Sequence, residues 1–207
     1  RVSTHRRFQE KGSRQMTRTL RILGLSLAAS TLFAGAASAA ETYTVDNSHT
    51  AVLFFAKHFN FSTVVGRFKT ASGEFVIDEA DASKSKINLE LKVDSLDTND
   101  GKRDEHLKGP DFFNAKQFPT ATFTSTAVKK SGDSFDVTGD LTIHGVKKSV
   151  TLKVKQNGKG QDPWGGTRTG FDGELAINRS DFGVSGMAPA IPTDIKLWFS
   201  VEGTLKK

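Results

Sequence analysis

Apolar and polar residues alternate over most of the chain after about residue 40. In the segment 86–94 every second residue is apolar and the residues between are charged or polar; the apolar positions are Ile87, Leu89, Leu91 and Val93. A period of two places alternate side chains on opposite faces of an extended strand. The segment is therefore predicted to be a strand with one buried and one solvated face, which is typical of antiparallel sheets.

The same alternation recurs along the chain, with turn residues between the runs. Connections of hairpin length at 131–133 and 144–147 indicate that consecutive strands pair in sequence order. The expected strands are 49–58, 64–78 (one bent strand or two short ones), 86–96, 120–128, 135–143, 150–154, 171–177 and 195–201, with a Gly-rich hairpin loop at 157–166. About eight antiparallel strands with one apolar face can close into a barrel, which leaves no exposed edge. The predicted fold class is all-β, an antiparallel barrel with one short helix.

That helix is expected within the segment 99–110, where Asn-Asp can cap its start and Gly-Pro ends it. A helix of this length is marginal by itself and has to dock on the strands. Arg103, Asp104 and His106 either fasten the helix or contact a ligand headgroup, and fastening is favoured because such a helix needs tertiary anchors. Arg179 follows a predicted strand in Asn-Arg-Ser-Asp. It is expected to belong to a turn clamped by hydrogen bonds, with headgroup recognition as the alternative.

The interior of such a barrel is either filled by side chains or holds one small ligand. Gly139 and Gly173 fall on the inward phase and add no volume, which favours a cavity; alternatively they relieve strain at corners or bulges. The chain has 16 phenylalanines and one tyrosine, so an apolar interior offers few hydrogen bonds and suits a hydrocarbon chain. The candidate ligand-binding residues are Val52, Phe54, Phe75, Leu89, Leu91, Phe123, Phe135, Gly139, Leu141, Leu152, Phe171, Gly173, Leu175, Leu197 and Phe199.

The first forty residues have the features of a targeting region. Residues 16–40 combine two arginines, an apolar run and small residues before an expected cleavage after Ala39 or Ala40, so a signal peptide is predicted. Residues 1–15 are expected to be an upstream extension without a fold, and residues 41–207 a single domain. The apolar run is short for a bilayer span, so no stable span is expected after cleavage. The expected location is the periplasm.

Charge and composition remove several classes of function. Residues 1–40 hold seven of the 29 basic and one of the 23 acidic residues, so the remaining chain is balanced at 22 of each. A nucleic-acid partner is therefore not expected. The chain has no cysteine, and its histidines do not follow metal-binding spacings, so neither a metal site nor a cofactor is predicted. No catalytic residue is assigned and an enzyme is not expected, because neither a nucleophile elbow nor a triad is recognisable.

Four ordered polar motifs carry a family resemblance. They are Asp-Asn-Ser-His at 46–49, the central signature within 95–119, Gly-Asp-Leu-Thr-Ile-His-Gly-Val at 139–146, and Ala-Ile-Asn-Arg-Ser-Asp-Phe-Gly at 176–183. Residues 41–207 resemble the YceI-like family of polyisoprenoid-binding proteins. The resemblance implies a lipocalin-like barrel with an elongated pocket for a polyisoprenoid or related lipid, commonly in the periplasm, and homodimers occur in such families. The alternative is a structural or stress-protective interaction module whose barrel is filled and binds no ligand.

Overall fold

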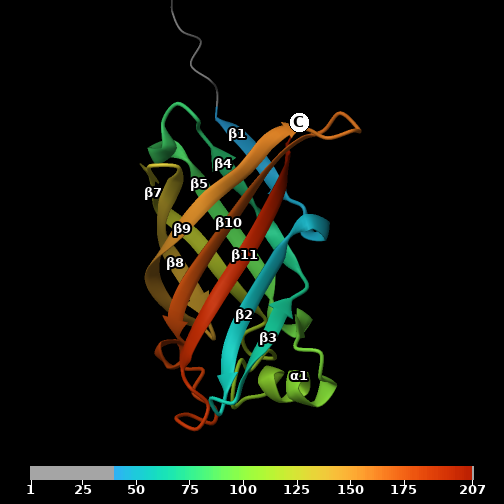
Figure 1. The fold of residues 1–207 in the computed structure, drawn as a ribbon, viewed down its shortest axis with the longest axis vertical. Helices are drawn as coiled ribbons and strands as arrows, with labels where there is room; N and C mark the ends of the chain where they lie inside the picture. Colours follow the sequence, from blue (N-terminus) through green and yellow to red (C-terminus); the bar gives the residue numbers. More distant parts are fainter. Residues whose placement is uncertain (1–39, 207) are drawn as a thin grey trace, which may run out of the picture. The chain divides into compact units, whose positions relative to one another are not determined.

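The computed structural model describes residues 40–206, which form an antiparallel β-barrel with one α-helix, as predicted (Figure 1). The predicted upstream extension at 1–15 and the signal peptide at 16–40 lie outside the described residues, apart from Ala40. Within 40–206, the structure contains no helix with the length and hydrophobicity needed to cross a bilayer.

The barrel is built from eleven strand segments. They are β1 (Glu41–Val45), β2 (Ala51–His58), β3 (Ser62–Phe68), β4 (Ala71–Ile77), β5 (Lys86–Lys92), β6 (Leu96–Asp97), β7 (Thr120–Ser131), β8 (Ser134–Ile143), β9 (Val146–Gln161), β10 (Thr167–Asn178) and β11 (Asp194–Leu205). The helix α1 spans Gly101–Lys108, and short 3-10 helices cover Asn47–His49 (η1), Ala82–Lys84 (η2), Val93–Ser95 (η3) and Arg179–Phe182 (η4).

Eight of these strands close the ring, in the order β1, β4, β5, β7, β8, β9, β10 and β11, with β11 pairing back to β1. The end of β11 pairs with β1, where Gly203 faces Val45, and its start pairs with β2, where Leu197 faces Phe54. β1 and β2 therefore follow one another along the same edge of β11, separated by η1. The expected number of about eight strands is confirmed, because three of them are interrupted: β1 with β2, β3 with β4, and β5 with β6.

Most strands extend beyond their predicted bounds, and two of the differences have a clear structural reason. The strand expected at 49–58 begins at Ala51, because Asp46 caps η1 through a hydrogen bond from the Ser48 amide (3.0 Å) and places His49 in that turn. β1, which precedes this turn, was missed. Residues 157–161 were expected to be loop but continue β9, where Lys159 pairs with Thr169. Backbone pairing with β10 extends this hairpin although its side chains have no apolar alternation.

The inward face follows the predicted alternation on β5, β8, β9, β10 and β11, whose apolar side chains gather in the core. β7 departs from it. A register shift between Ser125 and Ala127 inserts a bulge, so that Phe123 before it and Val128 after it both reach the interior. An extra residue in one strand reverses the phase of the side chains that follow.

Phenylalanine rings occupy the space beside the inward-facing glycines. A methyl group added at Gly173 would lie 2.3 Å from Cζ of Phe199, and one at Gly139 would lie 2.5 Å from Cζ of Phe123. The same arrangement recurs for Gly66 with Phe54 and for Gly203 with Phe75. The expectation that Gly139 and Gly173 leave open volume is therefore wrong. Their missing side chains let a ring from a neighbouring strand lie against the backbone.

This packing predicts the cost of adding a side chain at Gly173. We expect Gly173→Ala to lower the free energy of unfolding by about 1–3 kcal/mol in urea denaturation, because the methyl group and the Phe199 ring cannot occupy the same space. Gly158→Ala is the matched control, since a methyl group there would meet no atom within 4 Å. Adding Phe199→Leu to Gly173→Ala should restore part of the loss, and equal stability of the two alanine variants would contradict the packing.

Candidate functional site

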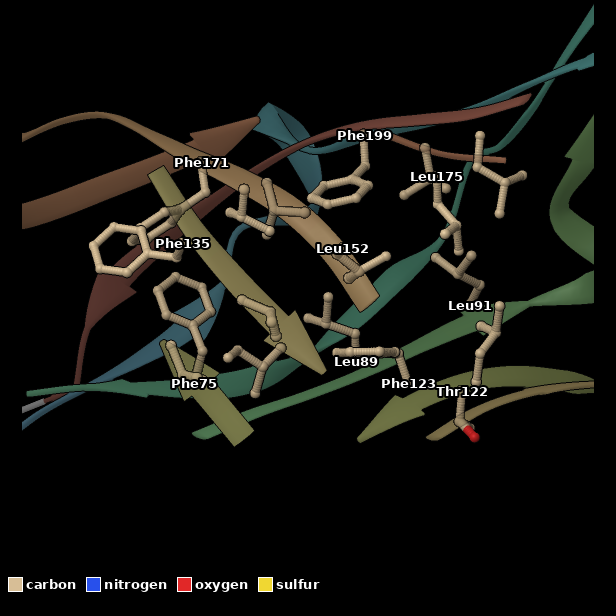
Figure 2. Close-up of a pocket in the computed structure, with 18 of the residues that line it drawn as sticks. Phe75, Leu89, Leu91, Thr122, Phe123, Phe135, Leu152, Phe171, Leu175 and Phe199 are labelled. Atoms are coloured by element: carbon tan, nitrogen blue, oxygen red, sulfur yellow. The ribbon is translucent and has the colours of Figure 1, made fainter. Parts of the chain in front are cut away.

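We call the end of the barrel away from α1 the upper end, as it is drawn in Figure 1. The upper half of the barrel encloses a cavity of about 170 Å³. Most of the residues predicted to bind a ligand line it: Val52, Phe75, Leu89, Leu91, Phe123, Phe135, Leu141, Leu152, Phe171, Leu175, Leu197 and Phe199. Figure 2 shows these side chains converging from several strands, with Phe75, Phe135 and Phe171 at one end and Leu91 and Leu175 toward the other. Phe54 lines a second cavity, and Gly139 and Gly173 line neither.

The wall of this upper cavity is almost wholly hydrocarbon. Among the described residues that line it, none is charged, and Ser85 and Thr122 carry the hydroxyl groups. The Ser85 hydroxyl already accepts a hydrogen bond from the Asp78 amide (3.1 Å). Burying a polar group here without a partner would cost about 1–3 kcal/mol. The cavity therefore favours a guest, or a part of one, that is purely apolar.

Three aromatic rings, Tyr43, Phe75 and Phe171, form what we call the aromatic plug at the upper end. The rings of Tyr43 and Phe75 stack with centroids 5.4 Å apart, and Phe75 meets Phe171 edge to face at 5.7 Å. Phe75 and Phe171 line the cavity, whereas Tyr43 is fully buried behind them. The Tyr43 hydroxyl donates to Glu41 at 2.7 Å, and Lys159 links Glu41 to Glu79. This end of the barrel is therefore closed.

Burial raises the pKa of Tyr43 to about 12, with a further contribution from its hydrogen bond to Glu41. The hydrogen bonds that Lys159 donates to Glu41 and Glu79 raise the pKa of its ammonium group, and the first of them lowers the pKa of Glu41. These shifts hold the pair charged and the phenol neutral near pH 7. Polar groups on the outside of the plug are thus paired with one another.

A second, larger cavity of about 460 Å³ lies at the other end, between the barrel, the β2–β3 hairpin, α1 and the loop after η4. It shares five lining residues with the upper cavity: Val52, Leu91, Ala121, Leu141 and Leu197. The two cavities therefore follow one another along the barrel, and an extended molecule in one would reach the other. Loop and helix residues such as Leu107, Phe112 and Ile191 complete the lower wall.

Among the described residues that line the two cavities, the charged and histidine side chains all belong to the lower cavity, and the upper cavity has only the hydroxyl groups of Ser85 and Thr122. The described lining of the lower cavity includes Lys57, His58, Lys102, Arg103, His106 and Arg179, and no acidic residue. Several of these side chains are exposed, so the lower cavity opens to solvent at the end of the barrel where α1 lies (Figure 1). The site has a closed apolar end and an open end with cationic groups.

Arg103 and Asp104 fasten α1 to Thr98, in the segment that joins β6 to the helix. The Thr98 amide and hydroxyl donate to Asp104 Oδ1 at 2.8 and 2.6 Å. Arg103 donates through Nε to the Thr98 hydroxyl (2.8 Å) and through Nη2 to the Thr98 carbonyl (2.7 Å). Thr98 is buried. These contacts agree with the interpretation favoured from the sequence, in which Arg103 and Asp104 anchor the helix. His106 makes no such contact and lies exposed, with its ring edge-on to Phe112.

Arg179 is buried and clamps the loop that follows η4. Its Nη1 donates to the Val184 carbonyl at 2.7 Å and its Nη2 to the Ile191 carbonyl at 2.9 Å, while its guanidinium group lies over the Phe112 ring. Burial lowers the pKa of Arg179. Among the described residues, no carboxylate oxygen lies within 4.0 Å of this guanidinium group. The predicted turn clamp thus also forms part of the wall of the lower cavity.

A separate polar cluster surrounds the break between β1 and β2. Hydrogen bonds from Ser48, His49 and Arg168 hold the pKa of the Asp46 carboxyl group well below its usual range. Asp46, His49 and Glu202 lie close enough to share a cation. Arg168, however, already donates to Asp46 at 2.5 Å and to Glu202 at 2.8 Å. The cluster fixes the turn that splits the first strand and lines neither cavity.

The sequence-based prediction of the site missed two groups of residues. Ile87, Val137, Val154 and Val201 line the upper cavity and belong to the alternating runs, so the alternation itself could have identified them. The residues of the lower cavity that lie outside the strands and α1, including Phe112, Phe182, Met187 and Ile191, belong to segments with no regular alternation. Their positions depend on the docking of α1 and on the Arg179 clamp, and no local pattern predicts either.

Comparisons with known proteins agree with this architecture. The YceI-like domain family matches residues 43–203. The Protein YceI of Salmonella newport is 43% identical over 188 residues, which covers 90% of this chain and 98% of the relative. The crystal structure of Burkholderia cenocepacia BcnA superposes with a TM-score of 0.70 at 29% identity, over 76% of this chain and 98% of that one.

Two further structures are similar. The Campylobacter jejuni YceI protein has a TM-score of 0.65 and is 35% identical, over 71% of this chain and 88% of that one. A polyisoprenoid binding domain from Saccharophagus degradans has a TM-score of 0.60 and is 18% identical, over 79% of this chain and 98% of that one. At that identity the last comparison shows a common fold.

The aromatic plug predicts an unusual titration of the phenol. Tyr43 is the single tyrosine of the chain, so the ultraviolet absorbance of tyrosinate reports on one group. We expect a midpoint at about 12 in the folded protein and about 10 in denaturant. Because the folded pKa is the higher one, the neutral phenol stabilises the fold fully below about pH 10, and this contribution is lost as the pH rises toward 12.

Glu41→Gln serves as the control for this titration. It removes the charged acceptor but leaves the ring buried, so the midpoint should fall and still remain above that of the denatured chain. A midpoint near 10 in the folded wild-type protein would show that the phenol is exposed and the upper end open.

Proposed function

The chain belongs to the YceI-like family, and from that premise we propose that its barrel binds one long apolar lipid of polyisoprenoid type and performs no chemistry on it. The observation that carries this proposal is the pair of apolar cavities that share a wall and lead from the aromatic plug to an open end. A hydrocarbon chain would lie along both cavities, with its far end against Phe75 and Phe171.

The expected driving force is the transfer of hydrocarbon from water. Each buried methylene group contributes about 0.8 kcal/mol, so a chain of several isoprene units would bind strongly without any hydrogen bond. The lower cavity by itself falls within the range of about 300–1,000 Å³ that is usual for ligand sites. Aromatic and branched side chains dominate the wall, which suits a guest with methyl branches. The Saccharophagus degradans domain, described as polyisoprenoid binding, has the same fold.

A filled barrel without a ligand is the alternative function, and it requires an interior closed by its own side chains. The cavities of about 170 and 460 Å³ argue against it. A site that is closed at one end suits holding or sequestering a lipid, or carrying it, better than conducting it through the barrel. We further propose that the protein works in the periplasm, which the signal peptide expected at 16–40 supports.

Organic extraction followed by mass spectrometry tests the proposal. Protein purified from its native cells should release a long-chain isoprenoid, or a lipid of similar length, in a molar ratio near one to the protein. Protein that is folded and yet releases no lipid, and takes up none when it is mixed with an isoprenoid alcohol, would favour the filled-barrel function instead.

The order of the two cavities predicts an effect on the length of the lipid. Leu152 lines the upper cavity and not the lower one, so Leu152→Trp should fill the space beneath the plug. We expect the variant to release lipids of shorter chain length while it keeps its overall loading. Lys155→Trp, on the outer face of the same strand, should leave the lipid profile unchanged.

Added bulk in a packed wall typically costs about 1–3 kcal/mol, so thermal unfolding of both variants should be measured alongside the lipid profile. An unchanged lipid profile in a stably folded Leu152→Trp variant would mean that the guest does not enter the upper cavity.

A further inference from the structure

Exposed apolar side chains gather at the open end of the barrel. Phe59 and Phe61 form the tip of the β2–β3 hairpin and are 38% and 88% exposed, and Met187, in the loop after η4, is 48% exposed. Phe59 and Met187 also line the lower cavity. The apolar wall of the site therefore continues outward onto two loop tips, where the Phe61 side chain in particular stays mostly exposed to solvent.

The backbone at these tips gives a second, independent indication. Phe59 has φ of 47° and Met187 has φ of 56°, in the left-handed region where glycine or asparagine is usual. A bulky side chain in this region costs about 1–2 kcal/mol. Two separate loops thus carry a large apolar side chain, exposed, at a position where it destabilises the fold. Such strain clusters at sites with a function.

Unpaired cations accompany these side chains. Lys57 and Lys102 are exposed and line the lower cavity, and among the described residues neither has a carboxylate oxygen within 4.0 Å. The exposed acids of α1 and the loop after it already have partners, since Glu105 lies 3.8 Å from Lys108 and Asp111 lies 3.8 Å from His106.

Asp100, Asp181 and Asp194 are also exposed near this end, and none of the three lines the cavity. The opening itself is therefore bordered by positive charge.

We propose that this end of the barrel docks on the surface of an anionic lipid bilayer, with Phe59, Phe61 and Met187 inserted among the lipids and Lys57 and Lys102 beside the phosphates. The inference rests on the proposed function, because a bilayer is the reservoir of long apolar lipids and docking would bring the opening against it. Apolar and aromatic side chains flanked by lysines are the combination that binds such surfaces.

The partner that fits best is a bilayer, because the apolar residues are single side chains on two protruding tips. A stable protein interface needs a continuous surface of about 800 Å² on each partner. The opposite end provides an internal comparison. Trp164, in the β9–β10 turn, is 85% exposed there, but it lines neither of the two cavities, and the aromatic plug lies between the upper cavity and that end.

Co-sedimentation with lipid vesicles tests the docking. The protein used is the chain as it is purified from the cells that produce it. We expect binding to vesicles of phosphatidylethanolamine and phosphatidylglycerol. Phe59→Asn combined with Phe61→Ser should weaken it by roughly tenfold or more, because the inserted apolar area is lost while asparagine tolerates the backbone of position 59. Lys102→Glu should weaken it by roughly fivefold or more on these vesicles, with little effect on phosphatidylcholine vesicles.

Two matched controls lie away from the opening. Trp164→Ser removes an exposed aromatic side chain at the closed end. Lys130→Glu makes the same charge change beside the β7–β8 turn. The other end of β8 leads to His144, whose ring contacts Phe118 in the segment after α1, so Lys130 lies at the end of β8 away from the opening. Both variants should bind vesicles as the wild type does.

Vesicle binding that is unaffected by the hairpin-tip substitutions, or that falls equally with Trp164→Ser, would overturn the inference. A wild-type protein that carries lipid but binds no vesicles would also overturn it, would leave the proposed function standing, and would favour a protein partner for the two tips. Binding through the tips by a protein that never contains lipid would sustain the docking surface and refute the proposed function.

Discussion

The pairing of β11 with β1 at one end and with β2 at the other is the constraint on which the rest of the structure depends. The pairing with β1 closes the ring of backbone hydrogen bonds and leaves no free edge along that ring, whereas β3 keeps an unpaired edge beyond its two-residue pairing with β6. Because side chains alternate along every strand, closure also forces the inward half of them into one space. The η1 turn separates β1 from β2, so that both can pair with β11 along one edge. The cluster of Asp46, His49 and Arg168 fixes that turn.

A closed barrel does not by itself contain a cavity, because side chains can fill its interior. The packing of side chains within the barrel wall explains why a cavity remains here. Phe199 and Phe123 lie over Gly173 and Gly139. Rings held against the backbone of a neighbouring strand project less far into the interior than they would over a larger residue. Glycine thus thins the wall instead of lining the cavity. Tight packing within the wall and open space at its centre are compatible for this reason.

The two ends of the barrel differ in chemistry, and this difference gives the site a direction. At the upper end, Tyr43 and Phe75 fill the interior, while Glu41 and Lys159 satisfy one another outside it. At the lower end, α1 and the loop after η4 stand apart from the ring, each held by an arginine that donates to backbone carbonyls. In the function that we propose, an apolar chain would gain most by lying with its end at the plug, and any polar group that it carried would lie nearest Lys57, Lys102 and Arg179.

The sequence by itself determined the all-β class, the number of strands, the position of α1 and most of the upper lining. Alternation along one strand and turn residues between strands are local properties, so they can be read without knowing what packs against what. Leu89, Leu152 and Phe171 were assigned correctly to the interior for that reason. The bulge in β7 was not predicted, because it depends on the pairing of neighbouring strands, and the break at η1 was missed although its Asp46 cap is a local contact.

Only the tertiary structure decided what the glycines do and where the site opens. Gly173 looks the same in the sequence whether its space is empty or filled, and a ring from another strand fills it. The lower cavity joins Phe54, Phe112 and Met187, which are far apart in the chain and share no pattern. Their meeting follows from the docking of α1 on Thr98 and from the Arg179 clamp, and hydrogen bonds of this kind leave no periodic trace in the residues that make them.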